Sequence, residues 1–145
     1  MLETRYGKIQ RGTGLYLIAE VGTTCDGDLK KSKELIDAAK HAGVDAVKFQ
    51  LIDPNQLSDK NATYKVVMDG IEKQVNMFDM FTKLSFQKKE WIELARYADG
   101  LEIDFFATVD FIDGVDILEE LNVPLHKIGA WDSTYEQLID KILNT

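Results

Sequence analysis

The segment spanning residues 16–50 constrains the fold of this chain more than any other feature. Its first part, residues 16–21, is a short apolar run that ends at Gly22, the pattern of a buried β-strand. A second apolar run, residues 44–49, follows after a stretch with helical periodicity. The apolar side chains of that stretch recur at spacings typical of one helix face: Leu29, Leu35, Ile36, Ala39 and Ala42. A strand, a helix and a strand without a hairpin turn form a βαβ unit, whose strands should be parallel.

Several residues have the chemistry and spacing of helix caps. Asp26 or Asp28 is expected to cap the first helix, because a carboxylate accepts the free N–H groups of a first turn. Ser85 is expected to cap the second helix in the same way. Ser133, with Glu136 three residues later, has the spacing of a capping box for the last helix.

The alternation of strand and helix continues to the end of the chain. A helix over residues 85–99 leads into a strand at 105–109, and a helix over 115–121 leads into a strand at 125–130. A last helix follows residue 133, which makes four strands and four helices. A closed (β/α)8 barrel takes about 250 residues. The sequence therefore predicts an α/β fold, the N-terminal (βα)4 half of a TIM barrel, with a small doubly wound domain as the alternative.

Two segments stand outside this alternation. Residues 1–14 are polar, and we expect them to form a small extension or a strand that closes the bottom of the barrel. Residues 53–84 form the longest stretch predicted to be irregular, and they contain clustered Met and Phe side chains. Excursions of this length are usually functional. This one leaves the C-terminal end of the second strand, so it should lie over the site, although it also fits a loop packed down by its own apolar side chains.

The composition excludes several classes of protein. The 145 residues suffice for one domain, and 45% of them are hydrophobic, which is enough for a core. A net charge of −8 argues against a nucleic-acid partner, which requires a basic face. No apolar run is long enough to span a membrane, and the N-terminus lacks the apolar core of a signal peptide. The single cysteine, Cys25, rules out an internal disulfide and fits a cytoplasmic location.

Charged residues interrupt both strands of the βαβ unit. Glu20 lies within the first apolar run, and Lys48 lies within the second, with Gln50 on the same face two residues later. A buried charge is costly unless it is paired or used. Both charges lie at the C-terminal ends of their strands, where parallel α/β proteins place their sites. The residues alone leave two interpretations open, a functional site and a structural Glu20–Lys48 ion pair.

Further polar residues lie at or just after the ends of the later strands. Thr108 and Asp110 end the third predicted strand, and Lys127 and Asp132 belong to the fourth. If the lysines point into the barrel, the ammonium groups of Lys48 and Lys127 converge at its top. Two lysines and a threonine hydroxyl can hold a phosphate and a carboxylate together, because both ligand groups are anionic. Phosphoenolpyruvate carries both groups.

Four runs of residues resemble a known family. They are IAEVG at 18–22, DGDL at 26–29, LIDAAK at 35–40 and AGVDAVKFQ at 42–50. Together they look like the opening of the sialic acid (N-acetylneuraminate) synthase family, and the run that ends in KFQ is the most specific. The resemblance continues more weakly to the end of the chain. It implies a condensation of phosphoenolpyruvate with an N-acetylated amino sugar, which forms a sialic-acid-like nonulosonic acid and releases phosphate.

The resemblance also implies roles for the strand-end residues. Lys48 matches the lysine of the family's KFQ run, and Lys127 matches that of its KI(G/A)SG(D/E) run; both contact phosphoenolpyruvate in the family. Thr108 matches the threonine after the third strand, and Gln50 is expected to support the same ligand by hydrogen bonding. Glu20 matches a glutamate that is a candidate proton donor to the sugar's carbonyl oxygen. In the implied reaction, C3 of phosphoenolpyruvate attacks the open-chain aldehyde, water adds at C2 and phosphate leaves.

Other implied features lie outside this chain. The family uses a divalent metal, manganese or magnesium, whose histidine ligands lie in the second half of the barrel and match neither His41 nor His126. The family is typically a homodimer, in which a C-terminal domain of the partner reaches over the site. Residues 1–145 are therefore expected to be the N-terminal half of a synthase domain, inactive alone because the metal ligands are missing.

The sequence departs from the family pattern at several positions. Ala130 and Trp131 stand where the family has Ser-Gly, and the missing serine helps to hold the phosphate. Trp131 is expected to crowd a place where the family has glycine, whereas Asp132 supplies a carboxylate where the family has an acid. These differences favour a divergent member with another sugar, or one with reduced or lost activity.

Two alternative functions stay open at this stage. One keeps the barrel and makes Lys48 or Lys127 the Schiff-base lysine of an aldolase. The other is a diverged, non-catalytic half-barrel that binds a sugar or a partner chain. The missing serine favours this last interpretation, and the presence of Glu20, Lys48 and Lys127 opposes it.

Overall fold

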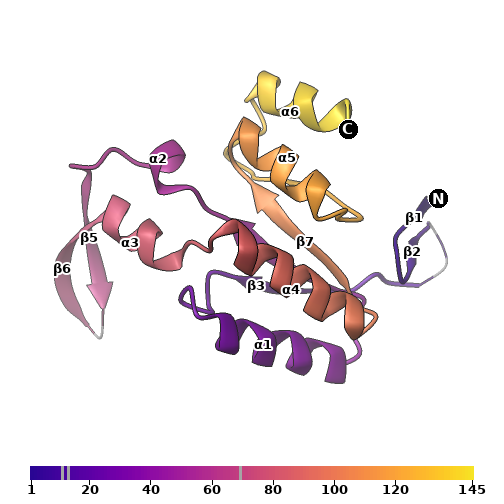
Figure 1. Cartoon of the computed structure of the whole chain (residues 1–145). Helices are drawn as coiled ribbons and strands as arrows, with labels where there is room; N and C mark the ends of the chain where they lie inside the picture. The colour runs from indigo at the N-terminus through magenta and orange to yellow at the C-terminus, as the bar shows by residue number, and fades with distance from the viewer. Residues whose placement is uncertain (11, 13, 69) are drawn as a thin grey trace.

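A four-stranded parallel sheet forms the centre of the fold (Figure 1). The computed structural model describes residues 1–10, 12, 14–68 and 70–145. The sheet has the strand order β3-β4-β7-β8, and every neighbouring pair is parallel. Its strands are β3 (Ile18–Gly22), β4 (Ala46–Leu51), β7 (Asp104–Val109) and β8 (Lys127–Ile128). Chain order and spatial order agree, as expected for the first half of a strand–helix barrel.

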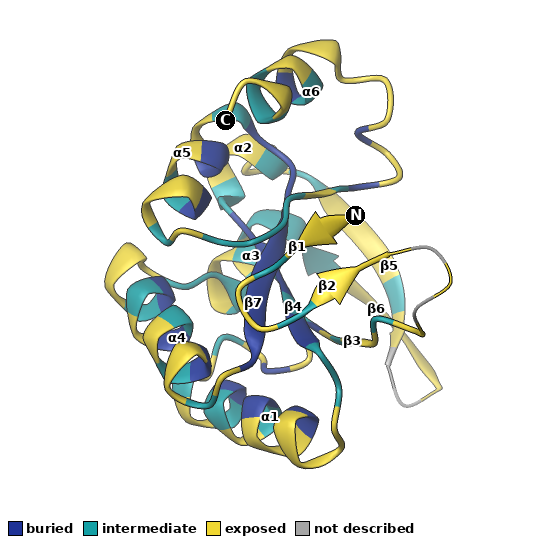
Figure 2. Ribbon diagram, turned by 90° about the vertical axis from the view of Figure 1, so that its right-hand side faces the viewer, coloured by how far each residue is buried: buried dark blue, intermediate teal, exposed yellow. Residues whose placement is uncertain are grey.

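The connecting helices pack on one face of this sheet. They are α1 (Leu29–His41), α4 (Lys88–Gly100), α5 (Ile112–Glu120) and α6 (Glu136–Leu143). Figure 2 shows β4 and β7 buried at the centre of the molecule, while the outer sides of the helices are exposed. Alternate strand side chains face the helices and join their apolar stripes in one core: Val47, Phe49, Leu51, Phe105, Ala107 and Val109.

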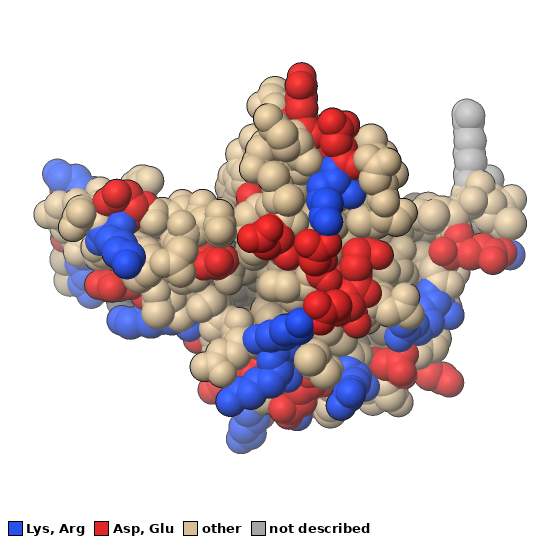
Figure 3. All heavy atoms as spheres, turned by 45° about the horizontal axis from the view of Figure 1, so that its top comes forward, with Lys and Arg blue, Asp and Glu red and all other residues tan. Residues whose placement is uncertain are grey.

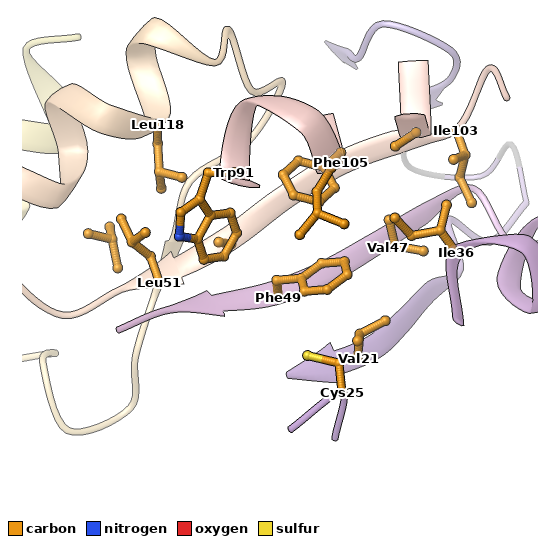
Figure 4. Close-up of a cluster of buried hydrophobic side chains, with 14 of the residues drawn as sticks. Val21, Cys25, Ile36, Val47, Phe49, Leu51, Trp91, Ile103, Phe105 and Leu118 are labelled. Atoms are coloured by element: carbon orange, nitrogen blue, oxygen red, sulfur yellow. The ribbon is translucent and has the colours of Figure 1, made fainter. Parts of the chain in front are cut away.

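Aromatic side chains dominate the middle of this core (Figure 4). Trp91 of α4 packs edge-on against Phe49 of β4 and Phe105 of β7, with ring centroids 6.2 and 6.1 Å apart. Phe49 and Phe105 lie on adjacent strands with their ring centroids 5.2 Å apart. Large rings in these offset arrangements bury much apolar area, which stabilises the packing of the helices on the sheet.

The predicted caps are partly correct. Asp28 caps α1, because its Oδ1 accepts the N–H of Lys31 at 2.9 Å. The prediction for Ser85 is wrong, since Ser85 follows the preceding helix and α4 begins only at Lys88. The Glu90 side chain there accepts the N–H of Gln87 at 2.8 Å. A glutamate that reaches back to the residue before the helix replaces the serine cap.

The predicted capping box at the last helix is also wrong. Tyr135 precedes the first residue of α6, Glu136, and no side chain caps this end by a hydrogen bond. Ser133 therefore lies in the turn before the helix rather than at its cap position. The fourth strand, predicted over 125–130, has only two residues. Its neighbour β7 ends at Val109, which pairs with Ile128, so residues beyond Ile128 have no strand to join.

The prediction of an irregular stretch over residues 53–84 is wrong. This segment contains a short helix, a β-hairpin and a second helix: α2 (Pro54–Leu57), β5 (Thr63–Met68), β6 (Ile71–Asn76) and α3 (Met77–Leu84). The hairpin strands are antiparallel, and Figure 1 shows them extending away from the sheet and its helices. Asn76 ends the hairpin and caps α3, since its Oδ1 accepts the N–H of Asp79 at 3.0 Å.

The N-terminal segment lies at the opposite end of the sheet. It forms a small antiparallel pair, β1 (Leu2–Glu3) and β2 (Lys8–Ile9); residues 11 and 13 lie outside the described ranges. Arg5 Nη1 is 2.6 Å from Asp99 Oδ1 near the end of α4. Tyr16 donates its hydroxyl to Asp104, the first residue of β7, at 2.6 Å. These contacts place the segment at the N-terminal ends of the strands, the bottom predicted from the sequence.

The surface charge follows the composition. Figure 3 shows acidic side chains gathered near the middle of the face it draws, with basic side chains below them. The net charge of the chain is −8. In the described part of the chain, no helix is both long and apolar enough to cross a membrane.

Candidate functional site

The polar strand residues lie on the sheet face that the helices leave uncovered. In β4, Val47, Phe49 and Leu51 join the helix-side core, so the alternate residues Lys48 and Gln50 point to the other face. In β7 the same alternation puts Thr108 on the face opposite Ala107 and Val109. The structure therefore confirms that Lys48 and Gln50 share one face at the C-terminal ends of the strands.

An ion-pair cluster occupies the β3–β4 side of this edge. Lys48 Nζ forms a salt bridge with Glu20 Oε2 and donates a hydrogen bond to Thr108 Oγ1 at 3.2 Å. Glu20 and Lys48 are also partners in the register between the two strands. The Lys48 side chain is 12% exposed and that of Glu20 is 59% exposed. The structural ion pair that the sequence left open is thus formed, and it holds the ammonium beside the Thr108 hydroxyl.

Lys127 does not join this cluster. In the strand register it pairs with Thr108 of β7, and β7 separates it from Lys48 on β4. Its Nζ, however, turns back and donates to the carbonyl oxygen of Ile128 at 2.7 Å, and its side chain is exposed. The sequence therefore placed Lys127 at the correct edge. The ammonium must rotate away from that carbonyl before it can share an anion with Lys48.

A carboxyl pair occupies the other side of the edge. Asp110 and Asp132 are both buried, at 7% and 8% exposure. Gln50 Nε2 donates to Asp110 Oδ2 at 3.1 Å, but Asp110 Oδ1 and Asp132 Oδ2 have no hydrogen-bond partner. Burial and the neighbouring Asp110 carboxyl raise the pKa of Asp132 to about 6. The sequence predicted that Asp110 lies at the end of its strand, but it indicated no role for this residue.

The turn after β8 brings these carboxyls close to the backbone. A Cβ atom placed on Gly129 would lie 2.4 Å from Asp132 Oδ2 and 3.1 Å from Asp110 Oδ1, so a larger residue there would force the Asp132 carboxyl to shift. The same Cβ would lie 3.1 Å from Nε1 of Trp131. Trp131 is otherwise exposed, at 73%. Ala130 beside it is exposed and has no hydroxyl to offer a phosphate.

A pocket of about 520 Å³ opens beside the carboxyl pair, within the usual range for small-molecule sites. Its floor consists of Gln50 of β4 together with Asp110, Trp131 and Asp132 from the loops that follow β7 and β8. Its opposite wall comes mainly from the hairpin and α3: Tyr64, Met77, Met80, Phe81 and Leu84. The excursion after β4 therefore lies over this edge of the sheet, as predicted, although its internal structure was not.

The side chains present do not by themselves fit a metal ion. Among the described residues, no three or more His, Cys, Asp or Glu side chains form a group that could hold one. His126 Nε2 lies 2.6 Å from Glu119 Oε1, and His41 is exposed at the end of α1. Cys25 is buried in the loop after β3. The described side chains therefore offer no complete ligand set for the metal that the resemblance implies.

Parallel strands with polar side chains at their C-terminal ends define a barrel-type site, here built from four strands. The sequence matches the model of the NeuB family over residues 35–145, and the chain belongs to this family. This is the sialic acid synthase family that the sequence motifs resemble.

Similar proteins support both the fold and the family. An uncharacterized protein of Methanocaldococcus jannaschii is 32% identical over 137 residues, which cover 94% of this chain and 37% of that protein. The N,N'-diacetyllegionaminic acid synthase of Legionella pneumophila is 32% identical over 129 residues, or 86% of this chain and 36% of the synthase. The solved N-acetylneuraminic acid synthetase of Leptospira borgpetersenii superposes with a TM-score of 0.76 at 24% identity, covering 94% of this chain and 46% of that one. The chain thus spans less than half of each protein.

Proposed function

We propose that this chain forms the N-terminal half of the catalytic barrel of an enzyme that condenses phosphoenolpyruvate with an N-acetylated amino sugar. The product is a sialic-acid-like nonulosonic acid, and inorganic phosphate leaves. Membership of the NeuB family and the likeness to a legionaminic acid synthase support this proposal. The observation that carries it is the contact of Lys48 with Glu20 and Thr108 at the strand ends. This cluster offers an ammonium and a hydroxyl where a barrel enzyme binds its substrate.

Each strand-end residue has a role in this proposal. Lys48 and Lys127 bind the phosphate and carboxylate of phosphoenolpyruvate, the latter after leaving the Ile128 carbonyl. Thr108 supports that ligand through its hydroxyl, and Gln50 through its amide. Glu20 is the orienting carboxylate that holds the Lys48 ammonium in place. Asp132 supplies a further carboxyl at the pocket floor.

The Schiff-base alternative is less well supported. An aldolase lysine attacks a carbonyl as the neutral amine, whereas a salt bridge requires the ammonium. Lys48 stands in such a bridge with Glu20. The homodimer, the metal, the cytoplasmic location and the assignment of residues 1–145 as half of a longer domain stay predictions.

A phosphate-release assay tests the proposal. The full-length gene product would receive phosphoenolpyruvate, manganese and a panel of N-acetylated amino sugars. We expect release that depends on one of the sugars and disappears in Lys48→Ala. Lys30→Ala is the matched control, because Lys30 lies on the exposed side of α1 and its side chain is 88% exposed. No release with any sugar from a folded, metal-loaded protein would overturn the proposal in favour of a diverged, non-catalytic barrel.

A further inference from the structure

Two carboxylate oxygens at the floor of the pocket converge on one point. Asp110 Oδ1 and Asp132 Oδ2 both lie close to the position that a Cβ of Gly129 would occupy, at 3.1 and 2.4 Å. Neither oxygen has a hydrogen-bond partner, and both side chains are more than nine-tenths buried. An unpartnered carboxylate oxygen is costly to bury. A proton shared between the two groups would lower that cost.

No basic side chain neutralises this pair. Among the described residues that line the pocket there is no lysine, arginine or histidine, and the only other titratable group is Tyr64 of β5. Lys48 is engaged by Glu20, and Lys127 by the Ile128 carbonyl. The remaining polar neighbours are the Gln50 amide, which donates to Asp110, and the Trp131 indole beside Gly129. Two adjacent carboxyls without a cation resist ionising together, which favours keeping one proton on the pair to a higher pH than an isolated aspartate would.

We propose that Asp110 and Asp132 share one proton and that this carboxyl pair is the acid that protonates the sugar's carbonyl oxygen during condensation. Asp132 faces the substrate from the pocket floor, and Asp110 is the positioning residue that keeps the proton on the pair. The proposal rests on the proposed function and adds a residue, Asp110, to which neither the strand-end motifs nor the ion-pair cluster gives a role.

Each proton moved in this step has a source and a destination. C3 of phosphoenolpyruvate forms a bond to the aldehyde carbon, and the carbonyl π electrons move to the oxygen. That oxygen takes the shared proton, which leaves both carboxylates ionised. Water then adds at C2 and gives one proton back to the pair. The bond from C2 to the phosphate oxygen breaks, C2 becomes a ketone, and the remaining hydroxyl proton leaves with the phosphate. A general acid works best when its pKa lies near the operating pH, and the raised pKa of Asp132, about 6, satisfies this condition.

Glu20 is less suited to this task. Its oxygen contacts the Lys48 ammonium, and its side chain is more than half exposed to water. The carboxyl pair is buried and has no cation beside it in the pocket lining. In this scheme Glu20 positions Lys48, while the pair supplies the proton.

Carbon-13 NMR of the aspartate carboxyl groups tests the shared proton without any need for activity. The titrations would be run on the full chain, on Asp110→Asn and on Asp140→Asn, an exposed control on α6 with the same change of charge. We expect one carboxyl to titrate near pH 6, to move toward ordinary aspartate values in Asp110→Asn, and to stay in place in the control. The proposal is overturned if the Asp132 titration is the same in Asp110→Asn as in the unmodified chain.

The pH dependence of turnover in the full-length enzyme tests the catalytic role. We expect kcat to fall as the pH rises through about 6, and Asp110→Asn to move this limb to lower pH and reduce kcat at pH 7 by about tenfold or more. The KM for phosphoenolpyruvate should change little, since Lys48 binds that ligand. A wild-type pH profile in Asp110→Asn would overturn the acid role while leaving the proposed function intact. If the unmodified enzyme releases no phosphate with any sugar, both fail, whatever the carboxyl titrations show.

Discussion

The two sides of the strand-end edge differ in how their charges are compensated. On the β3–β4 side, Lys48 touches an opposite charge, Glu20, and a hydroxyl, Thr108. On the β7–β8 side, Asp110 and Asp132 are like charges, buried together, with an oxygen on each left without a partner. On the first side, the Lys48 ammonium can exchange the Glu20 carboxylate for an anionic ligand. The second side needs a proton and therefore responds to pH.

The difference follows from how well water solvates the charged groups on each side. Glu20 is largely exposed, so water screens it and the ion pair adds little to stability. The carboxyl pair is buried beside a pocket that the hairpin, α3 and Trp131 also line, and desolvation there favours the neutral form. We therefore expect changes on the first side to affect turnover most and changes on the second to affect stability and pH dependence.

The largest effect is expected for Lys48→Ala. Removing the ammonium takes away the main cation of the β3–β4 side, and deleting one such electrostatic group typically lowers kcat by about 10²–10³. Sugar-dependent phosphate release by the full-length enzyme measures the loss, and Lys30→Ala should retain normal rates. Equal rates in Lys48→Ala and the unmodified enzyme would remove the functional distinction between the two sides.

The next effect concerns the pH dependence of stability. The pKa of Asp132 is about 6 in the folded chain against an ordinary value of 3.8, so the folded state holds a proton that the unfolded state releases. This contribution is fully present below pH 3.8 and is lost as the pH rises through 6, by up to about 3 kcal/mol. Urea unfolding of the chain and of Asp132→Asn between pH 4 and 7 measures it. The variant should gain stability relative to the unmodified chain as the pH rises, and a constant difference would contradict the account.

A smaller loss is expected for Gly129→Ala. The new Cβ would meet Asp132 Oδ2 at 2.4 Å and Asp110 Oδ1 at 3.1 Å, so the turn or the pair must shift. We expect a loss of roughly 2 kcal/mol, the usual size for an added methyl group in a packed site. Denaturant unfolding gives the number. In an Asp132→Ala background the loss should shrink, because the main clash is gone, and an undiminished loss would show that Asp132 is not what excludes the side chain.

The smallest effect is expected for Thr108→Val. The change keeps the shape of a buried side chain but removes the oxygen that accepts from Lys48 Nζ, while the salt bridge with Glu20 stays. We expect a loss of about 1 kcal/mol in stability and a several-fold drop in phosphate release. Thr134→Val, at an exposed position, is the control. A drop as large as that of Lys48→Ala would contradict this ranking, because the hydroxyl would then matter as much as the ammonium.

Much of the fold could be predicted from the sequence because the sheet and its helices obey local patterns. Residues 44–49 gave the position of β4 to within two residues, and the stripe that contains Trp91 identified the buried face of α4. The hairpin was missed because its apolar residues, such as Val67 and Ile71, are exposed and form no clear alternation. The Asp-Gly pair at residues 69–70 was the available signal, since such pairs favour hairpin turns.

The site was predicted in part for the same reason. Residue parity along β4 correctly put Lys48 and Gln50 on one face, and the strand-end rule brought Glu20 and Thr108 to the same edge. The Asp110–Asp132 pair could not be derived, because it depends on a turn after β8 in which Gly129 lets both carboxyls approach. Such a contact between distant segments leaves no periodic trace in the sequence.

The most direct test of the account is the affinity of the full-length protein for phosphoenolpyruvate, measured by isothermal titration calorimetry. Lys48→Ala and Lys127→Ala should each weaken binding by about tenfold or more, because each removes a cation from the anion site. Asp110→Asn should leave the affinity unchanged or slightly higher, because it removes negative charge from the other side of the edge. Binding that is insensitive to both lysines but lost in Asp110→Asn would contradict the division of the edge into an anion-binding side and a proton-holding side.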